Sequence, residues 1–182
     1  MDIYKTENAS DFEKFVAYSL NGHEGIGVHV AKERCVWTGQ LPTINRTECK
    51  NKKLYIGSGK YLGGTIVDMV GDVTLCITTY YISDYAPKLV DSFAKYLEEK
   101  GIEITRDEND ILANGKKVVS WARATSINGW TQSFIHFSVG KMNLKLVKAI
   151  CTKPMVKKPG SLAELGVTTE DVLERLNFDI KE

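Results

Sequence analysis

A lysine pair directly after a tight turn is the feature of this sequence best placed to do chemistry. Asn114-Gly115 lies between the apolar runs Ile111-Leu112-Ala113 and Val118-Val119. Asn-Gly in that setting is a strong hairpin signal, because a type I′ turn needs positive φ at both central residues. Side chains alternate between the faces of a strand, so Lys116 and Lys117 are predicted to face opposite sides. One lysine would then deliver a cation to a fixed place in a pocket.

The same lysines could both be solubilising charges at a hairpin tip, because lysine is rarely buried without a partner. The hairpin alone does not separate these two interpretations. The elements that surround it must decide between them.

The composition indicates one globular domain, which we place at residues 1–182. The chain has 182 residues, 43% of them hydrophobic, which is enough for a continuous core. A formal net charge of +1 disfavours nucleic acid and anionic membranes as partners. The four cysteines lack CxxC spacing, no apolar run approaches the roughly 18 residues of a spanning helix, and the polar start is unlike a signal peptide. We therefore expect a cytoplasmic protein with reduced cysteines.

Hydrophobic periodicity predicts helices inserted between groups of strands. Helices are expected from Ser10 as N-cap to residue 20, from Asp84 to Lys100, near residues 144–150, and after Thr168 or Thr169. Strands are expected at 26–30 and 35–37 as a hairpin, at 54–56, at 65–69 and 73–81 as an adjacent antiparallel pair, at 102–105, and at 131–139. Residues 39–52 read as a long surface loop. This order favours an α+β fold with a mixed, largely antiparallel sheet and helices packed on it.

Several catalytic patterns are disfavoured by residue spacing. The histidines His23, His29 and His136 lack metal-ligand spacing, and the last two fall in predicted strands, where a structural role is more common. Gly57-Ser58-Gly59-Lys60 is followed by Tyr rather than by the Ser or Thr and helix of a phosphate loop. Cys76 lies within an apolar strand, which favours an inert thiol.

The order of the parts resembles the lipoate-protein ligase branch of the biotin/lipoate ligase superfamily. An N-terminal helix is followed by a hairpin that reaches the Gly-Gln loop Thr38-Gly39-Gln40, then by a glycine-rich loop, a helix and the lysine hairpin. The resemblance spans residues 12–176. In that family a loop of the form RRxSGGGAVxHDxGN wraps the acyl tail and the adenylate. A hairpin of the form NDxxxxxxKxxG supplies a lysine that contacts the acyl carbonyl and the phosphate.

The family pattern can be carried onto this sequence position by position in both segments. Leu62-Gly63-Gly64 stand at the three glycines, Thr65-Ile66 at Ala-Val, and Gly71-Asp72 at Gly-Asn. Asn109-Asp110 match the Asn-Asp, and Lys117 matches the lysine.

The resemblance implies an ATP-dependent ligase that activates lipoate, or a related small carboxylate, as an acyl-adenylate. The acyl group would pass to a lysine of an acceptor protein. Lys117 would be the catalytic residue, because a fixed cation stabilises charge that builds on phosphate oxygens. Asp110 would be the ligand of a magnesium ion. The implied nucleotide-binding and acyl-binding residues are Lys60, Tyr61, Leu62, Gly63, Gly64, Thr65, Asp68, Asn109, Asp110, Ser120 and Ala122.

The glycine-rich loop departs from the family pattern more than the hairpin does. The family's arginine pair, serine, first glycine and histidine are replaced by Ser58-Gly59, Tyr61, Leu62 and Asp68. Either Lys60 replaces the bidentate arginines as a point charge, or adenylation is lost. Trp121 stands where the family has a small residue, so we expect its indole to shorten or fill the acyl tunnel.

Other functions therefore stay open beside the ligase. An acyltransferase of the same fold would take its acyl group from a carrier protein and would need no arginine pair. A ligand-binding protein that has lost catalysis is favoured by the altered loop. A protein-interaction module is the remaining alternative.

Overall fold

The computed structural model describes residues 1–39 and 43–181. Residues 40–42 and 182 lie outside the described part, and with them Gln40 of the predicted Gly-Gln loop. The described strands are β1 (Ile3–Thr6), β2 (Gly25–Val30), β3 (Cys35–Thr38), β4 (Tyr55–Ser58), β5 (Thr65–Asp68), β6 (Val73–Tyr80), β7 (Ile104–Asp107), β8 (Asp110–Ala113), β9 (Lys116–Thr125) and β10 (Trp130–Phe137). They form a seven-stranded sheet of order β1-β2-β6-β10-β9-β8-β7 and a three-stranded sheet of order β4-β3-β5. Two strand pairs, β1 with β2 and β3 with β4, are parallel, and the other pairs are antiparallel.

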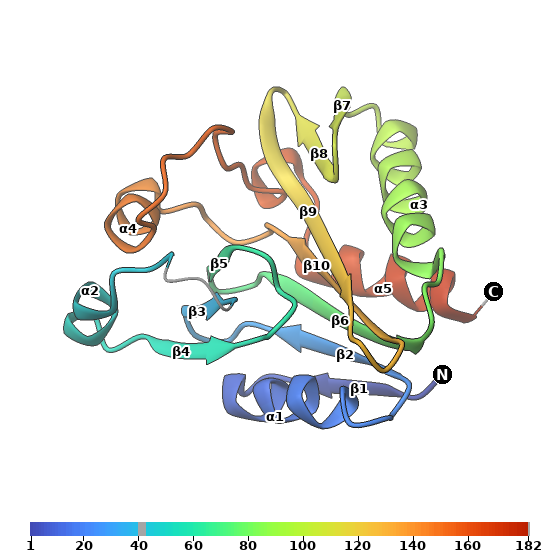
Figure 1. Cartoon of the computed structure of the whole chain (residues 1–182). Coiled ribbons are helices and arrows are strands. Elements are labelled where there is room, and N and C mark those ends of the chain that lie inside the picture. Colours follow the sequence, from blue (N-terminus) through green and yellow to red (C-terminus); the bar gives the residue numbers. More distant parts are fainter. Residues whose placement is uncertain (40–42, 182) are drawn as a thin grey trace.

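Five α-helices lie among the described residues, and they divide between the two faces of the large sheet. They are α1 (Ala9–Ser19), α2 (Arg46–Asn51), α3 (Tyr85–Glu99), α4 (Leu144–Ile150) and α5 (Thr169–Lys181), with a 3-10 turn at Ala163–Leu165. Figure 1 shows α3 and α5 on one side of the seven-stranded sheet, and the three-stranded sheet with α2 and α4 on the other. This arrangement confirms the predicted α+β fold with a mixed, largely antiparallel sheet.

Three apolar clusters hold these layers together. The first joins α3 and α5 to one face of the large sheet, through residues such as Phe93, Leu176 and Ile135. The second lies between α1, the three-stranded sheet and the other face of the large sheet, and we call it the inner cluster: Phe12, Val16, Cys35, Trp37, Leu62, Cys76 and Phe134. The third packs α2 and α4 onto the outer side of β3. Alternation along β3 explains the split, because Cys35 and Trp37 face the inner cluster while Val36 faces the third.

The predicted Asn-Gly hairpin is confirmed. Asn114 and Gly115 join β8 to β9 with φ values of 51° and 78°, both positive as a type I′ turn requires. The helix predicted after Asp84 and the last helix are also confirmed as α3 and α5. In each case the sequence pattern lies within the element itself, so the prediction did not depend on pairing with distant parts of the chain.

Two predicted strand pairings are wrong. β2 pairs with β1 and β6, whereas β3 belongs to the three-stranded sheet. Likewise β5 pairs with β3, not with β6. The chain crosses between sheets at both places, and the crossings bond to each other, because Ala31 N donates to Asp72 O and Gly71 N donates to Ala31 O.

Two smaller predictions are also wrong. The N-cap of α1 is Asn8, whose side chain accepts from the backbone of Ser10 and Asp11. The predicted loop at residues 39–52 contains α2, capped by Asn45 and held by Cys49 in the third cluster. A single turn and a half of helix carries too little periodicity to be read from sequence. In the described part of the chain, no helix has the length and apolar character needed to cross a membrane.

Candidate functional site

A cavity of about 370 Å³ lies where the lysine hairpin meets the glycine-rich segment. β9 and β10 supply one wall through Lys117, Ser120 and His136, while the start of β5 supplies another. The segment 151–159, which follows α4, closes the third side. The lining residues are Thr43, Gly64, Thr65, Ile66, Val67, Lys117, Val118, Val119, Ser120, His136, Ser138, Met142, Val147, Cys151, Lys153, Pro154, Met155, Val156, Lys157 and Pro159.

Backbone pairing fixes the position of Lys117. Its N–H donates to Lys158 O at 2.8 Å, and its carbonyl accepts from Gly160 N at 2.8 Å. A register shift opposite Ile111 and Leu112 places Val118 as an extra residue in β9. With the strand held on both edges, Lys117 lines the cavity and its neighbour Lys116 does not.

Two further lysines reach the same cavity from the segment 151–159. Lys153 and Lys157 line it together with Lys117. Lys157 Nζ lies 2.7 Å from Asp110 Oδ2 and 3.3 Å from Asp107 Oδ2, and these bonds raise the pKa of its ammonium, chiefly through Asp110. Sequence reasoning missed both lysines. The segment has no periodicity, and the only signal was its local density of lysine and proline.

The predicted glycine-loop residues divide into two groups. Gly64 and Thr65 line the cavity, whereas Tyr61 and Leu62 pack into the inner cluster. Gly63 has φ +88°, and a Cβ built on it would lie 3.3 Å from Ala122 Cβ. Lys60, the predicted replacement for the arginine pair, lies over the ring of Tyr61 at 5.3 Å and does not line the cavity. Ala122 lies under the loop and outside the cavity.

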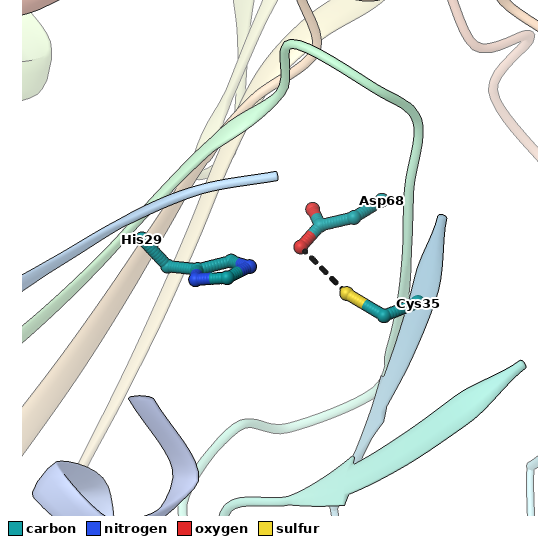
Figure 2. Close-up of side chains that lie close together, drawn as sticks. All are labelled: His29, Cys35 and Asp68. Carbon is teal, nitrogen blue, oxygen red and sulfur yellow. Dashed lines mark hydrogen bonds between the residues drawn. The ribbon is translucent and has the colours of Figure 1, made fainter. Parts of the chain in front are cut away.

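Asp68 is fully buried behind the cavity rather than exposed in it. Trp37 Nε1 donates to Asp68 Oδ2 at 2.7 Å, and Cys35 Sγ donates to the same oxygen at 3.4 Å. Thr74 Oγ1 donates to Asp68 Oδ1 at 3.2 Å. Figure 2 shows the side chain of His29, from β2, directed toward Asp68 and Cys35. Burial lowers the pKa of His29, and the charge of Asp68 opposes that shift.

His136 connects this buried carboxylate to the cavity and was not predicted as a site residue. Its Nδ1 lies 3.3 Å from Asp68 Oδ1 and 3.1 Å from Thr74 Oγ1, and its Nε2 lies 3.5 Å from Asp72 Oδ2. Asp72 accepts backbone N–H bonds from Met69, Val139 and Gly140, yet burial raises its pKa to about 6. The ring of His136 is thus held between two buried acids with one side on the cavity.

The fold brings together donor atoms that sequence spacing kept apart. Among the described residues, His29–Cys35–Asp68 and Asp68–Asp72–His136 each place one ligand atom per residue within 4.8 Å of the others. Both oxygens of Asp68 already accept hydrogen bonds. Hydrogen bonds join Cys35 to Asp68, and Thr74 joins Asp68 to His136, whereas His29 is hydrogen-bonded to Thr6.

Four other predicted positions are placed as follows. Ser120 lines the cavity, and Trp121, one residue later, faces the opposite side, where it packs against the α3 and α5 layer. The expectation that the Trp121 indole fills the acyl tunnel is therefore wrong, because strand alternation turns it away. Asn109 O accepts from Trp121 N, and Asp110 Oδ2 is bonded to Lys157.

Cys151 is the one cysteine on the wall of the cavity in the part of the chain that is described. Burial raises the pKa of its thiol, while the charge of Lys117 opposes the shift. Cys35, Cys49 and Cys76 are buried in the apolar clusters.

Comparison with solved structures shows which known proteins share this fold. No protein-family model matches the sequence, and no curated protein matches it. A lipoate-protein ligase A bound with ATP superposes with a TM-score of 0.76 at 14% identity, covering 98% of this chain and 83% of that one. A putative lipoate protein ligase from T. acidophilum with bound lipoic acid gives 0.75 at 13% identity over 98% and 82% of the two chains.

Other solved structures share the fold with different TM-scores and different coverage. P. falciparum LipL1 in complex with lipoate gives a TM-score of 0.74 at 15% identity, over 98% of this chain and 60% of that one, so the present chain spans about three-fifths of it. A biotin protein ligase from Aquifex aeolicus in complex with biotin gives 0.56 at 13% identity, over 100% and 70% of the two chains. The chain has the biotin/lipoate ligase fold. The agreement is higher with the lipoate-protein ligase structures than with the biotin ligase, so the fold predicted from the sequence resemblance is confirmed.

Proposed function

We propose that this protein is an ATP-dependent ligase that activates lipoate, or a related small carboxylate, as an acyl-adenylate and transfers it to a lysine of an acceptor protein. The proposal rests on one observation: Lys117 lines a cavity with Gly64 and Thr65 on the facing wall. These are the segments that the family resemblance assigns to the phosphate, the acyl carbonyl and the adenylate. The shared fold supports the same assignment.

The cavity residues suit binding of a triphosphate. Lys117 and Lys153 line the cavity with no carboxylate partner among the described residues, whereas Lys157 lines it while bonded to Asp110. We assign to these lysines the role of the missing arginine pair. A Cβ at Gly64 would meet nothing within 4 Å, so a ligand can approach the backbone closely there. A cavity of about 370 Å³ is within the usual size range of small-ligand sites.

Lys117 would act in both half-reactions. In the first, a carboxylate oxygen bonds to the α-phosphorus of ATP, the bond to the β-phosphate breaks, and pyrophosphate leaves. Negative charge grows on the α-phosphate oxygens, and the fixed ammonium of Lys117 stabilises it. In the second, the neutral amine of an acceptor lysine bonds to the acyl carbon, AMP leaves, and the amine loses a proton. Lys117 would polarise the acyl carbonyl during that step.

The arrangement around Asp110 does not offer an open carboxylate to magnesium. Its Oδ2 is bonded to Lys157 Nζ at 2.7 Å, and Asp110 does not line the cavity. A magnesium ligand at Asp110 would require Lys157 to leave.

Carboxylate-dependent exchange of labelled pyrophosphate into ATP tests the ligase directly. We expect exchange with at least one acid from a panel that includes butanoate, hexanoate, octanoate, lipoate and biotin. Lys117→Ala should reduce kcat by about 10²–10³-fold, the usual cost of removing one group that stabilises an oxyanion.

The matched control is Lys116→Ala, which removes the same charge one residue away and outside the cavity. Its exchange rate should stay within about two-fold of the parent, as expected of a surface change. Exchange by the parent that Lys117→Ala leaves intact would contradict the assignment of Lys117. Absence of exchange with every acid would contradict the ligase.

A second candidate function is acyl transfer from a carrier protein, and the position of Cys151 favours it. In that reaction the Cys151 sulfur bonds to the acyl carbon of a carrier thioester, and the carrier thiol leaves with the proton. An acceptor amine then takes the acyl group and restores the thiol. The raised pKa of Cys151 means that a base or Lys117 must help to form its thiolate.

Intact-protein mass spectrometry separates the two candidates. After incubation with an acyl-carrier thioester and no ATP, the transferase would gain the mass of one acyl group, and Cys151→Ser would prevent a labile thioester from forming. A ligase would show no adduct under these conditions and would retain exchange in Cys151→Ser.

A further inference from the structure

The floor of the cavity ends abruptly along two neighbouring strands. Ser120 of β9 pairs with His136 of β10, and two residues further along the same face Ala122 pairs with Phe134. Ser120 and His136 line the cavity, whereas Ala122 and Phe134 do not. The change from open to closed floor therefore takes place within one two-residue step, about 7 Å of strand.

The glycine-rich loop covers the closed part of the floor. Gly63 lies directly on Ala122, and a Cβ built on Gly59 would lie 3.1 Å from the ring of Phe134. Leu62, between these glycines, is 5% exposed and packs in the inner cluster with Phe134. At Gly64, by contrast, a Cβ would meet nothing within 4 Å. The wall of the cavity thus stands between Gly63 and Gly64.

We propose that the acid bound by this protein is compact, shorter than octanoate, and that Leu62 and Phe134 set this limit. The inference rests on the proposed function. A carboxylate held at Lys117 can extend along the floor as far as Ser120 and His136. Beyond them, in the described part of the chain, the side chains of the inner cluster fill the space that a longer tail would need. Leu62 takes the place of the first glycine in the loop that, in the family it resembles, wraps the acyl tail.

Pyrophosphate exchange with a chain-length series tests the limit. For the parent protein we expect kcat/KM with butanoate to exceed that with octanoate or lipoate by about ten-fold or more, the discrimination typical of a pocket that is too short. Leu62→Ala should narrow or reverse this ratio, because it opens space along the floor. Phe134→Leu is the second opening variant, should Leu62→Ala fold poorly.

The matched control is Leu176→Ala, which removes the same atoms from a leucine that is 2% exposed on the opposite side of the large sheet. It should lower stability without changing the chain-length ratio. Octanoate or lipoate used by the parent as well as butanoate would overturn the inference while leaving the ligase intact.

Absence of exchange with every acid would contradict the ligase itself. Binding measurements would then test the chain-length limit on its own. Calorimetric titration with octanoate should then show binding to Leu62→Ala and at least about ten-fold weaker binding to the parent and to Leu176→Ala. Equal octanoate binding by all three proteins would overturn the inference on its own.

Discussion

The β8–β9 hairpin and the segment at residues 57–68, which contains the glycine-rich loop and β5, meet at one cavity, yet their residues have different roles. In the hairpin, backbone bonds to Lys158 and Gly160 on one edge and pairing with β8 on the other hold Lys117 on the cavity wall. In the loop, Gly64 and Thr65 face the cavity while Leu62 and Tyr61 lie in the inner cluster.

This difference shows what fixes the position of each segment. A hairpin is placed by its ladder, so its outward residues can change without moving the rest. A loop is placed by the side chains that it buries, so one larger residue can turn it into part of the core. Leu62 makes the loop part of the core in this way. Asp68, the last residue of β5, has a comparable structural role through its buried hydrogen bonds.

The largest effect on stability is expected at Asp68. Asp68→Ala should lower the free energy of unfolding by about 3–5 kcal/mol, because it leaves Trp37 Nε1 and Thr74 Oγ1 buried without their acceptor. Urea denaturation followed by tryptophan fluorescence measures the change. Asp91→Ala, which removes an exposed partner of Arg106, is the control and should cost about 0–1 kcal/mol.

A small loss of unfolding free energy in Asp68→Ala would contradict the proposed difference between the loop and the hairpin. It would mean that the carboxylate is not anchored in the core and is free to serve the ligand. A small loss of stability together with normal pyrophosphate exchange would mean that Asp68 supports neither the core nor the ligand.

The neighbouring glycines Gly63 and Gly64 give the next largest effect and a sharper test. Gly63→Ala should lower the free energy of unfolding by about 1–3 kcal/mol, because φ +88° strains an L side chain and the new methyl meets Ala122. Gly64→Ala should change stability by less than about 0.5 kcal/mol, since its methyl would enter open space. Thermal unfolding of both variants measures the contrast.

Ligand binding should show the reverse order. Gly64→Ala places a methyl on the cavity lining, so its KM for ATP or the acid should rise while that of Gly63→Ala changes less. Equal loss of stability in the two variants would contradict a cavity wall between them.

Local patterns in the sequence were enough to predict the hairpin and most helices. Asn114-Gly115 specifies its own turn, and the spacing of Leu89, Val90 and Phe93 specifies the buried face of α3. The resemblance then predicted the fold. It also predicted Lys117 as the lysine that belongs in the pocket, and the structure gives that residue a place on the cavity wall.

Long-range pairing decided what the sequence could not predict. The crossings at Ala31 and Gly71-Asp72 send β3 and β5 to a second sheet, and no local pattern marks such a crossing. His136 reaches the cavity only because its strand pairs with both β6 and β9. Lys153 and Lys157 lie in a segment without periodicity, whose position depends on its bonds to β9 and Asp110.

The turn of the hairpin provides a smaller effect that isolates backbone strain. Gly115 has φ +78°, and a Cβ there would meet nothing within 4 Å. Gly115→Ala should therefore cost about 1–2 kcal/mol from the left-handed backbone alone. Chemical denaturation measures it, and Asn114→Gly, which keeps positive φ available, is the control. A cost as large as that of Asp68→Ala would mean that the turn is coupled to the rest of the sheet.

The smallest effect is expected at Lys153, a cavity lysine that, like Lys117, has no carboxylate partner among the described residues. Two unit charges about 4 Å apart in water interact by about 1 kcal/mol, so Lys153→Ala should raise the KM for ATP about five-fold. The increase should shrink as salt is added, because mobile ions screen exposed charges. Lys95→Ala on the exposed side of α3 is the control, and its KM should not change. A salt-independent loss of kcat in Lys153→Ala would instead mean that Lys153 acts on the reacting atoms, and the loop segment after α4 would then share the role that we assign to the hairpin.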